Sequence, residues 1–94
     1  MRKVFISGKV SGLSYVVAQE RFNEAARRFK NCDVVNPIKL CNPKWSWSRC
    51  MAACLWHLLR CDTVAMLSNW RSSRGAKIEH FLALMLRKKV IYLR

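Results

Sequence analysis

The chain has 94 residues, of which 52% are hydrophobic, and 18 Lys and Arg against five Asp and Glu give a formal net charge of +13. This length fits a single domain, residues 1–94, and is too short for a second core. No apolar run reaches the roughly 18–20 residues of a membrane-spanning helix, so no membrane partner is expected, and the apolar start at residues 4–6 is too short for a secretion signal. We therefore expect a cytoplasmic protein.

Strands and helices are predicted to alternate along the chain. The first apolar run ends in a turn that contains Gly8 and Gly12, and a later run, Thr63 to Leu67, is apolar enough for a strand covered on both faces. In chain order we expect a strand at 4–6, a helix at 14–30, a short strand at 33–37, a loop at 38–47, a helix at 48–60, a strand at 62–68, a helix at 74–87 and a strand at 90–93. This alternation predicts an α/β fold with a parallel sheet and helices on both faces.

The positive charge of the chain has two interpretations. A basic protein attracts phosphate groups, whether on nucleic acid, on a nucleotide or on a membrane. Alternatively, the charges only form a solvated surface, because they are spread over several segments and make no extended basic arm. Lys9, Arg71 and Arg74 are the candidate phosphate contacts.

The segment from Trp70 to His80 is the best candidate for a binding site. It joins a buried strand to a helix, and ligands of open α/β sheets bind at the carboxyl ends of the strands. The start of that helix offers free N–H groups and a positive dipole end to an anion. Glu79 in this helix is either an ordinary surface charge or the chemical centre, as a nucleophile on a sugar carbon or a general base. It is expected to lie across the same sheet edge as Ser7 and Gly8.

The five cysteines give an odd count, so we expect reduced thiols rather than a disulfide framework. Four potential metal ligands share one face of the predicted 48–60 helix and its end: Cys50, Cys54, His57 and Cys61. One helix cannot wrap four ligands around an ion, so small apolar packing is the preferred interpretation and no metal or other cofactor is expected. Cys32 and Cys41 lie near turns and are predicted to add no second half of a site.

Three tryptophans also allow two interpretations. Trp45, Trp47 and Trp70 form either a surface on which a base stacks or a set of core and subunit-contact residues. The packing interpretation is favoured for one or two of them. The high apolar fraction in so small an α/β domain also indicates a homo-oligomer.

Several separated segments carry a family resemblance. They are the Val4–Leu13 segment, Val34-Val35-Asn36-Pro37, the Leu58–Asp62 segment and Trp70 to His80. Over essentially its whole length the chain resembles a small bacterial and phage family of uncharacterised domains that are related to the nucleoside 2-deoxyribosyltransferases and the 2-deoxynucleoside 5-phosphate N-hydrolases. The resemblance implies a Rossmann-like (flavodoxin-like) three-layer sandwich, and we expect a four-stranded parallel sheet of order 2-1-3-4. If a phage encodes the chain, its compartment is the host cytoplasm.

The resemblance also implies roles for particular residues. The family's Ser-x-Gly-x-x-x-Glu run corresponds to Ser73, Gly75 and Glu79. By this resemblance Ser73 would bind a phosphate or ribose oxygen, and Gly75 would allow the backbone to come close to the ligand. Glu79 would attack the sugar. Ser7, Gly8, Lys9, Gly12, Trp70, Arg71 and Arg74 complete the expected ligand-binding set. The N-hydrolases carry an aspartate where this chain has Cys54, and a thiol is a poor substitute for a proton-shuttling acid.

Three functions follow as hypotheses. The first is binding of a nucleoside, nucleotide or related ribosyl ligand at the carboxyl edge of the sheet, with cleavage or transfer at its N-glycosidic bond as the possible reaction. The second is a non-catalytic phage protein that sequesters a nucleotide immune signal. The third is a basic protein that binds nucleic acid directly.

Overall fold

Four parallel strands form the central sheet of the computed structural model, which describes residues 2–10, 14–42 and 44–93. The strands are β1 (Lys3–Ser7), β2 (Asp33–Val35), β3 (Thr63–Met66) and β4 (Lys89–Tyr92). Their order, β2-β1-β3-β4, confirms the predicted order 2-1-3-4. In the register of the sheet Phe5 pairs with Val35 on one side and Val64 on the other, and Val64 pairs in turn with Val90.

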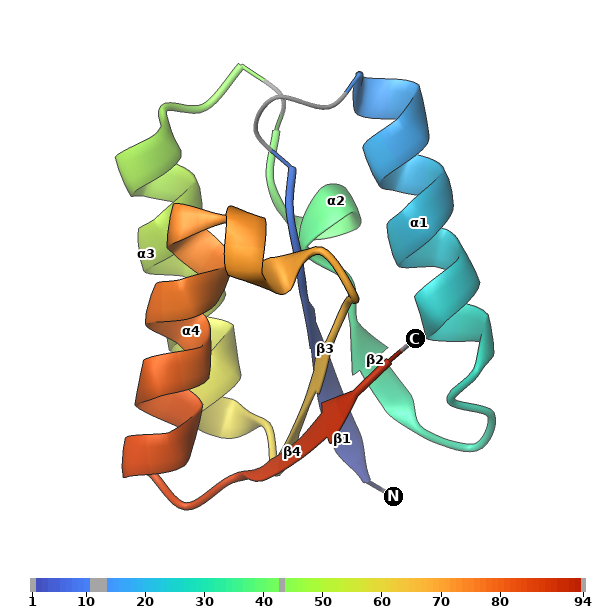
Figure 1. The fold of residues 1–94 in the computed structure, drawn as a ribbon, viewed down its shortest axis with the longest axis vertical. Coiled ribbons are helices and arrows are strands. Elements are labelled where there is room, and N and C mark those ends of the chain that lie inside the picture. The colour runs from blue at the N-terminus through green and yellow to red at the C-terminus, as the bar shows by residue number, and fades with distance from the viewer. Residues whose placement is uncertain (1, 11–13, 43, 94) are drawn as a thin grey trace.

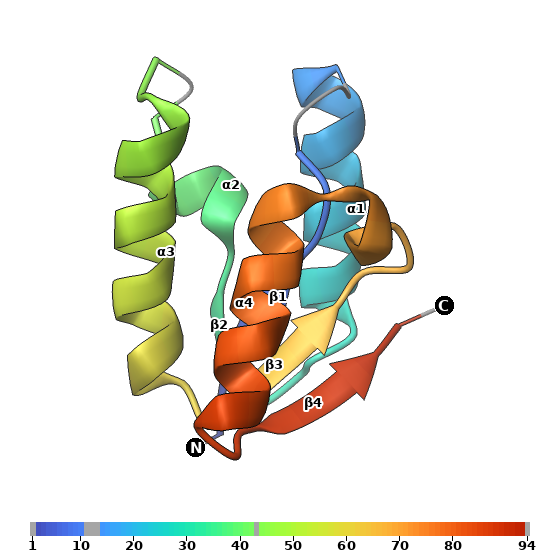
Figure 2. The ribbon, with the colours of Figure 1, turned by 60° about the vertical axis from the view of Figure 1, so that its left-hand side comes forward.

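Helices cover both faces of this sheet, which confirms the three-layer α/β fold (Figure 1). Helix α1 (Tyr15–Arg27) lies on one face, and α3 (Trp47–Arg60) and α4 (Arg74–Met85) lie together on the other (Figures 1 and 2). The short helix α2 (Pro37–Leu40) and the 3-10 turn η1 (Trp70–Ser72) lie near the carboxyl ends of the strands. Within the described ranges, no helix combines the length and apolar character needed to cross a bilayer.

The core has two parts, one on each face of the sheet. Phe5, Val64 and Met66 pack on the α3 and α4 side, whereas Ile6 and Leu67 pack on the α1 side. This division follows from the alternation of side chains along a strand. The α1 side is completed by Ala18, Phe22, Ala25 and Ile38, and the other side by Cys54, Leu58, Cys61, Ala76 and Ala83.

The prediction of a loop over 38–47 is wrong for its first residues, because the chain forms helix α2 there. Asn36 caps this helix, since its Oδ1 accepts a hydrogen bond of 3.1 Å from the N–H of Ile38, and Pro37 occupies the first helical turn. The strand predicted at 33–37 therefore ends at Val35. An Asn followed by Pro is a typical helix start, so local chemistry explains the difference.

The other predicted elements are present with shifted ends. Strand β1 is longer than 4–6, β3 is shorter than 62–68, and β4 and α3 begin one residue earlier than expected. Helix α1 ends three residues before residue 30, and Asn31 beyond it has φ of 62°. Helix α4 ends at Met85 rather than 87, because Arg87 adopts φ of 57° and the N–H of Lys88 bonds to the carbonyl oxygen of Ala83 at 2.9 Å.

The left-handed backbone at Arg87 leads to a stability prediction. A non-glycine residue in this region is strained by about 1–2 kcal/mol, and glycine relieves the strain at some cost in unfolded-state entropy. We expect Arg87→Gly to raise the free energy of unfolding by up to about 1 kcal/mol in urea titrations. The matched variant Arg27→Gly, within the last turn of α1, should instead lower it by about 0.5–1 kcal/mol. If Arg87→Gly lowered the free energy of unfolding as much as Arg27→Gly does, the backbone at Arg87 would not be strained.

Candidate functional site

A cavity of about 330 Å³ opens where β1 ends and α4 begins, at the carboxyl edge of the sheet. Its volume lies within the range of small-molecule sites. The walls come from the segment after β1, from α1 and α2, and from the first halves of α3 and α4. The described residues that line it are Gly8, Val10, Tyr15, Phe22, Pro37, Ile38, Cys41, Asn42, Trp45, Ser46, Trp47, Cys50, Met51, Cys54, Ser73, Gly75, Ala76 and Glu79.

Among the described residues of the lining, Glu79 is the acidic one, and it is only 5% exposed. The Ser7 hydroxyl donates a hydrogen bond of 2.6 Å to Oε1 of Glu79, so the end of β1 and the second turn of α4 meet as the strand order requires. Burial raises the pKa of Glu79 to about 7, and the bond from Ser7 opposes this rise. At neutral pH both forms of the carboxyl group are therefore populated, which suits a group that exchanges a proton or binds a hydroxyl.

Two glycines bring the backbone close to its surroundings at this site. A Cβ atom on Gly8 would lie 2.7 Å from Cβ of Leu67, and one on Gly75 would lie 2.9 Å from Sδ of Met51. Ser73 caps α4, since its Oγ accepts a hydrogen bond of 3.2 Å from the N–H of Ala76. The cap leaves the Ser73 hydroxyl proton available to a ligand, because a hydroxyl both accepts and donates.

Two tryptophans belong to the lining of the cavity. Trp45 and Trp47 both line it, and each carries an arginine over its ring. The guanidinium carbon of Arg49 lies 4.4 Å from the Trp45 ring centre, and that of Arg74 lies 4.7 Å from the Trp47 ring centre. Two rings of the cavity lining are therefore each paired with a positive charge, although neither arginine belongs to the described lining itself.

Other predicted ligand contacts lie elsewhere. Trp70 packs against His80, with ring centres 4.2 Å apart, and Arg71 lies over Trp70 at 5.5 Å. The backbone N–H of Lys9 donates a hydrogen bond of 3.0 Å to Asn69. None of Lys9, Trp70 and Arg71 belongs to the described cavity lining, and Gly12 lies outside the described residues. Of the predicted residues, Gly8, Ser73, Gly75 and Glu79 line the cavity. Ser7 and Arg74 are not in the described lining, but Ser7 bonds to Glu79 and Arg74 lies over the ring of Trp47.

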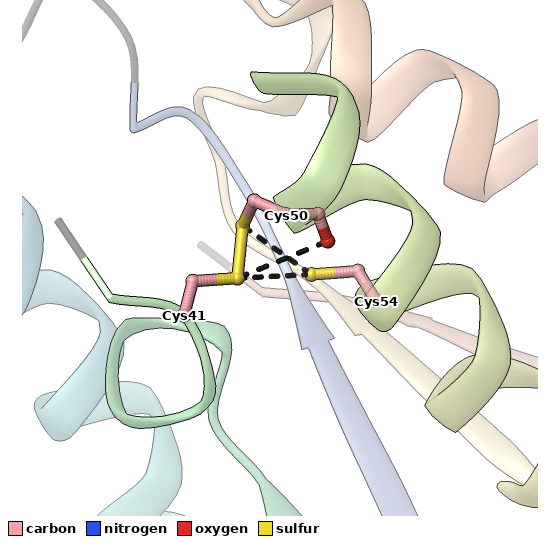
Figure 3. A group of neighbouring side chains, drawn as sticks. All are labelled: Cys41, Cys50 and Cys54. Carbon is pink, nitrogen blue, oxygen red and sulfur yellow. Dashed lines mark hydrogen bonds between the residues drawn. A yellow bond between two sulfur atoms is a disulfide. The ribbon is translucent and has the colours of Figure 1, made fainter. Parts of the chain in front are cut away.

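The cysteines differ from the sequence-based expectation. Cys41 and Cys50 form a disulfide, so the expectation of reduced thiols throughout is wrong for this pair. Cys41 was predicted to add no second half of a site, but the C-terminal end of α2 lies against α3 and places Cys41 beside Cys50 and Cys54 (Figure 3). Sγ of Cys54 lies 3.9 Å from the sulfur of each partner. Burial, with a smaller contribution from Glu79, raises the pKa of the Cys54 thiol to about 12.

Several lining residues were not anticipated as part of a site. Cys41 and Asn42 reach the cavity because α2 turns the chain toward α3, and Met51 does so from the second turn of α3. The helix start at Asn36-Pro37 was the available signal for the first two. Ser46, whose Oγ accepts a hydrogen bond from the N–H of Arg49, marked the start of α3 in the same way.

Comparison with known proteins assigns the chain to a family. No curated protein and no solved structure matches it significantly. A family model matches residues 2–92, which is nearly the whole chain and includes every element of the cavity. The chain therefore belongs to the family described as "Domain of unknown function (DUF4406)".

Proposed function

We propose that the cavity binds a nucleoside, a nucleotide or a related ribosyl ligand. The observation that carries this proposal is the buried Glu79 carboxyl group, which is held by Ser7 inside a cavity at the carboxyl edge of a parallel sheet. A carboxyl group at this depth can accept hydrogen bonds from ribose hydroxyls. The likeness of Ser73, Gly75 and Glu79 to the motif of nucleoside 2-deoxyribosyltransferases supports the same ligand class.

The remaining parts of such a ligand have suitable surroundings. The indole rings of Trp45 and Trp47 offer flat surfaces to a base. The first N–H groups of α4 and the guanidinium of Arg74 offer positive charge to a phosphate. The proposal therefore places the base near the tryptophans, the ribose near Glu79 and a phosphate near residues 73–75.

Cleavage of the N-glycosidic bond is a second candidate function, which Glu79 favours. Its ionised form would attack the anomeric carbon, the bond from that carbon to the base nitrogen would break, and the base would leave with the electron pair and need a proton. Water would then release the sugar from Glu79. The nearby Cys54, with a pKa raised to about 12, holds its proton too firmly to supply it readily. Ligand binding without turnover therefore stands first.

Calorimetric titration of the purified chain tests the proposal. The probes are deoxynucleosides, their 5′-monophosphates and ribose 5-phosphate, with chromatography of each mixture for free base. Binding with the ligand recovered intact supports a binding or sequestering protein. Release of base that Glu79→Gln abolishes, and Glu20→Gln on the exposed face of α1 does not, establishes the enzyme. If none of the probes binds, the proposal is wrong.

Direct nucleic-acid binding is tested in the same series. An affinity for duplex or single-stranded DNA that falls steeply with salt, in the absence of nucleotide binding, would favour the +13 charge as the functional feature. Loss of that affinity through Glu79→Gln is not expected, because removal of an acidic group cannot weaken a contact to phosphate.

Self-association remains part of the proposal. Helix α4 exposes several apolar side chains beside the edge strand β4, and Phe81 and Met85 are 54% and 68% exposed. Exposed apolar side chains of this kind are typical of subunit contacts when they are contiguous. The homo-oligomer and the cytoplasmic location are kept as predictions.

A further inference from the structure

Three sulfur atoms gather at one wall of the cavity. Cys41 at the end of α2, Cys50 in α3 and Cys54 one turn further along α3 place their Sγ atoms within 4.8 Å of one another. Figure 3 shows the three side chains converging from the two elements. Cys54 is buried, and the other two are partly exposed. The helix supplies two of the three sulfurs because residues four apart share one of its faces.

Two of the three sulfur–sulfur separations match those of a tetrahedral zinc site. Four ligands at about 2.3 Å from a tetrahedral zinc ion lie about 3.8 Å from each other. Cys54 Sγ already lies 3.9 Å from Sγ of both Cys41 and Cys50. Two of the three sulfur–sulfur distances that a tetrahedral site needs are therefore present. The third, between Cys41 and Cys50, is reached when their disulfide is broken and the two sulfurs move apart.

We propose that Cys41, Cys50 and Cys54 form a three-thiolate site for Zn²⁺ when the Cys41–Cys50 disulfide is reduced. Two molecules of a thiol reductant supply the two electrons and two protons, are themselves joined in a disulfide, and leave Cys41 and Cys50 as free thiols. Binding of Zn²⁺ then forms three zinc–sulfur bonds and releases the three thiol protons. All three cysteines line the cavity, so the fourth position faces it and is filled by water or by a ligand.

Sulfur ligands determine the class of metal. Three thiolates select zinc and other soft or borderline ions, whereas Mg²⁺ and Ca²⁺ prefer oxygen. The ligands come from two elements, α3 and the end of α2, so they can surround an ion in a way that a row on one helix cannot. His57 and Cys61 are not needed, and Cys61 is buried in the core beside Phe5 and Leu58.

Cobalt titration of the full chain tests the site. The protein is reduced with a phosphine, which takes up oxygen from water as it supplies the electrons, and is then titrated with Co²⁺ under anaerobic conditions. We expect one equivalent to bind with thiolate-to-cobalt charge-transfer absorption, and Zn²⁺ to displace it. The untreated, disulfide-bonded protein should show no such absorption, and this comparison requires no variant.

Variants identify the ligands. Cys54→Ala and Cys41→Ala should each weaken binding by more than about 100-fold, because even loss of an outer-shell partner of a metal ligand costs about 10–100-fold. Cys32→Ala is the control, since Cys32 is a free cysteine outside the cluster, and it should bind as the wild type does. Circular dichroism verifies that each variant is folded.

Two results would overturn the proposal. One is a reduced wild-type protein that binds neither Co²⁺ nor Zn²⁺ in these titrations. The other is binding that Cys32→Ala weakens as much as Cys41→Ala, which would place the metal on unrelated thiols. Neither result bears on nucleotide binding, which is measured with different probes, so the two proposals fail separately.

Discussion

Glu79→Gln is expected to raise the free energy of unfolding by roughly 3 kcal/mol at pH 8 and to leave it nearly unchanged at pH 4. The reason is the pKa of Glu79, which burial raises from 4.5 to about 7. Because the folded state holds this proton more tightly than the unfolded state, the resulting stability is complete below about pH 4.5 and is lost as the pH rises through about 7. Glutamine is uncharged at every pH and can still accept the hydrogen bond from Ser7.

Urea titrations at several pH values measure this difference. The neighbouring His80 contributes with the opposite sign, because burial and Arg71 lower its pKa and the folded state therefore binds its proton less tightly. Subtracting the wild-type curve from the Glu79→Gln curve cancels the His80 contribution. Glu20→Gln, an exposed carboxylate on α1, should follow the wild type. A Glu79→Gln variant that is less stable than the wild type at pH 8 would show that the ionised carboxylate is stabilised in the fold.

Trp45→Ala is expected to weaken nucleotide binding by about 10- to 100-fold, because stacking of a base on an aromatic ring contributes about 1–3 kcal/mol. Trp45 lines the cavity, and its ring is one of the two flat surfaces there. Calorimetric titration with the tightest-binding monophosphate gives the affinity. Ribose 5-phosphate, which has no base, should bind to the variant and the wild type equally.

The matched control is Trp56→Ala. Trp56 also lies on the α3 side of the molecule with an arginine over its ring, since Arg60 lies 5.8 Å from it, but it is 59% exposed and does not belong to the described cavity lining. Its loss should not alter affinity. If both variants bind the nucleotide as the wild type does, the base does not stack on Trp45.

The sheet could be predicted from the sequence because its signals are local and redundant. The run from Thr63 to Leu67 is apolar at nearly every position, and only a strand with both faces covered explains this in an α/β chain. Helix α2 gave no such signal, since four residues are too short to show helical periodicity, and its evidence is the capping chemistry of Asn36 and Pro37 alone.

One contact of the candidate site was predictable because it follows from topology. Glu79 and Ser7 are far apart in sequence, but strands that are parallel neighbours end at the same edge, so their proximity follows from the strand order. The position of Trp70 did not follow from the sequence. Trp70 was predicted to contact the ligand, but it lies in the 3-10 turn η1 and its ring packs against His80. The disulfide was not predictable either, since it depends on how α2 directs Cys41 toward α3.

The raised pKa of Glu79 has a consequence for any ligand that occupies the cavity. A group that titrates near neutral pH changes its proton occupancy when a neighbour arrives, so binding is accompanied by proton exchange with the buffer. Hydroxyl donors against Glu79 would stabilise its ionised form and release protons, whereas a phosphate beside it would cause proton uptake. Titrations in buffers of different ionisation enthalpy would therefore reveal, from the sign of this exchange, which end of the ligand faces Glu79.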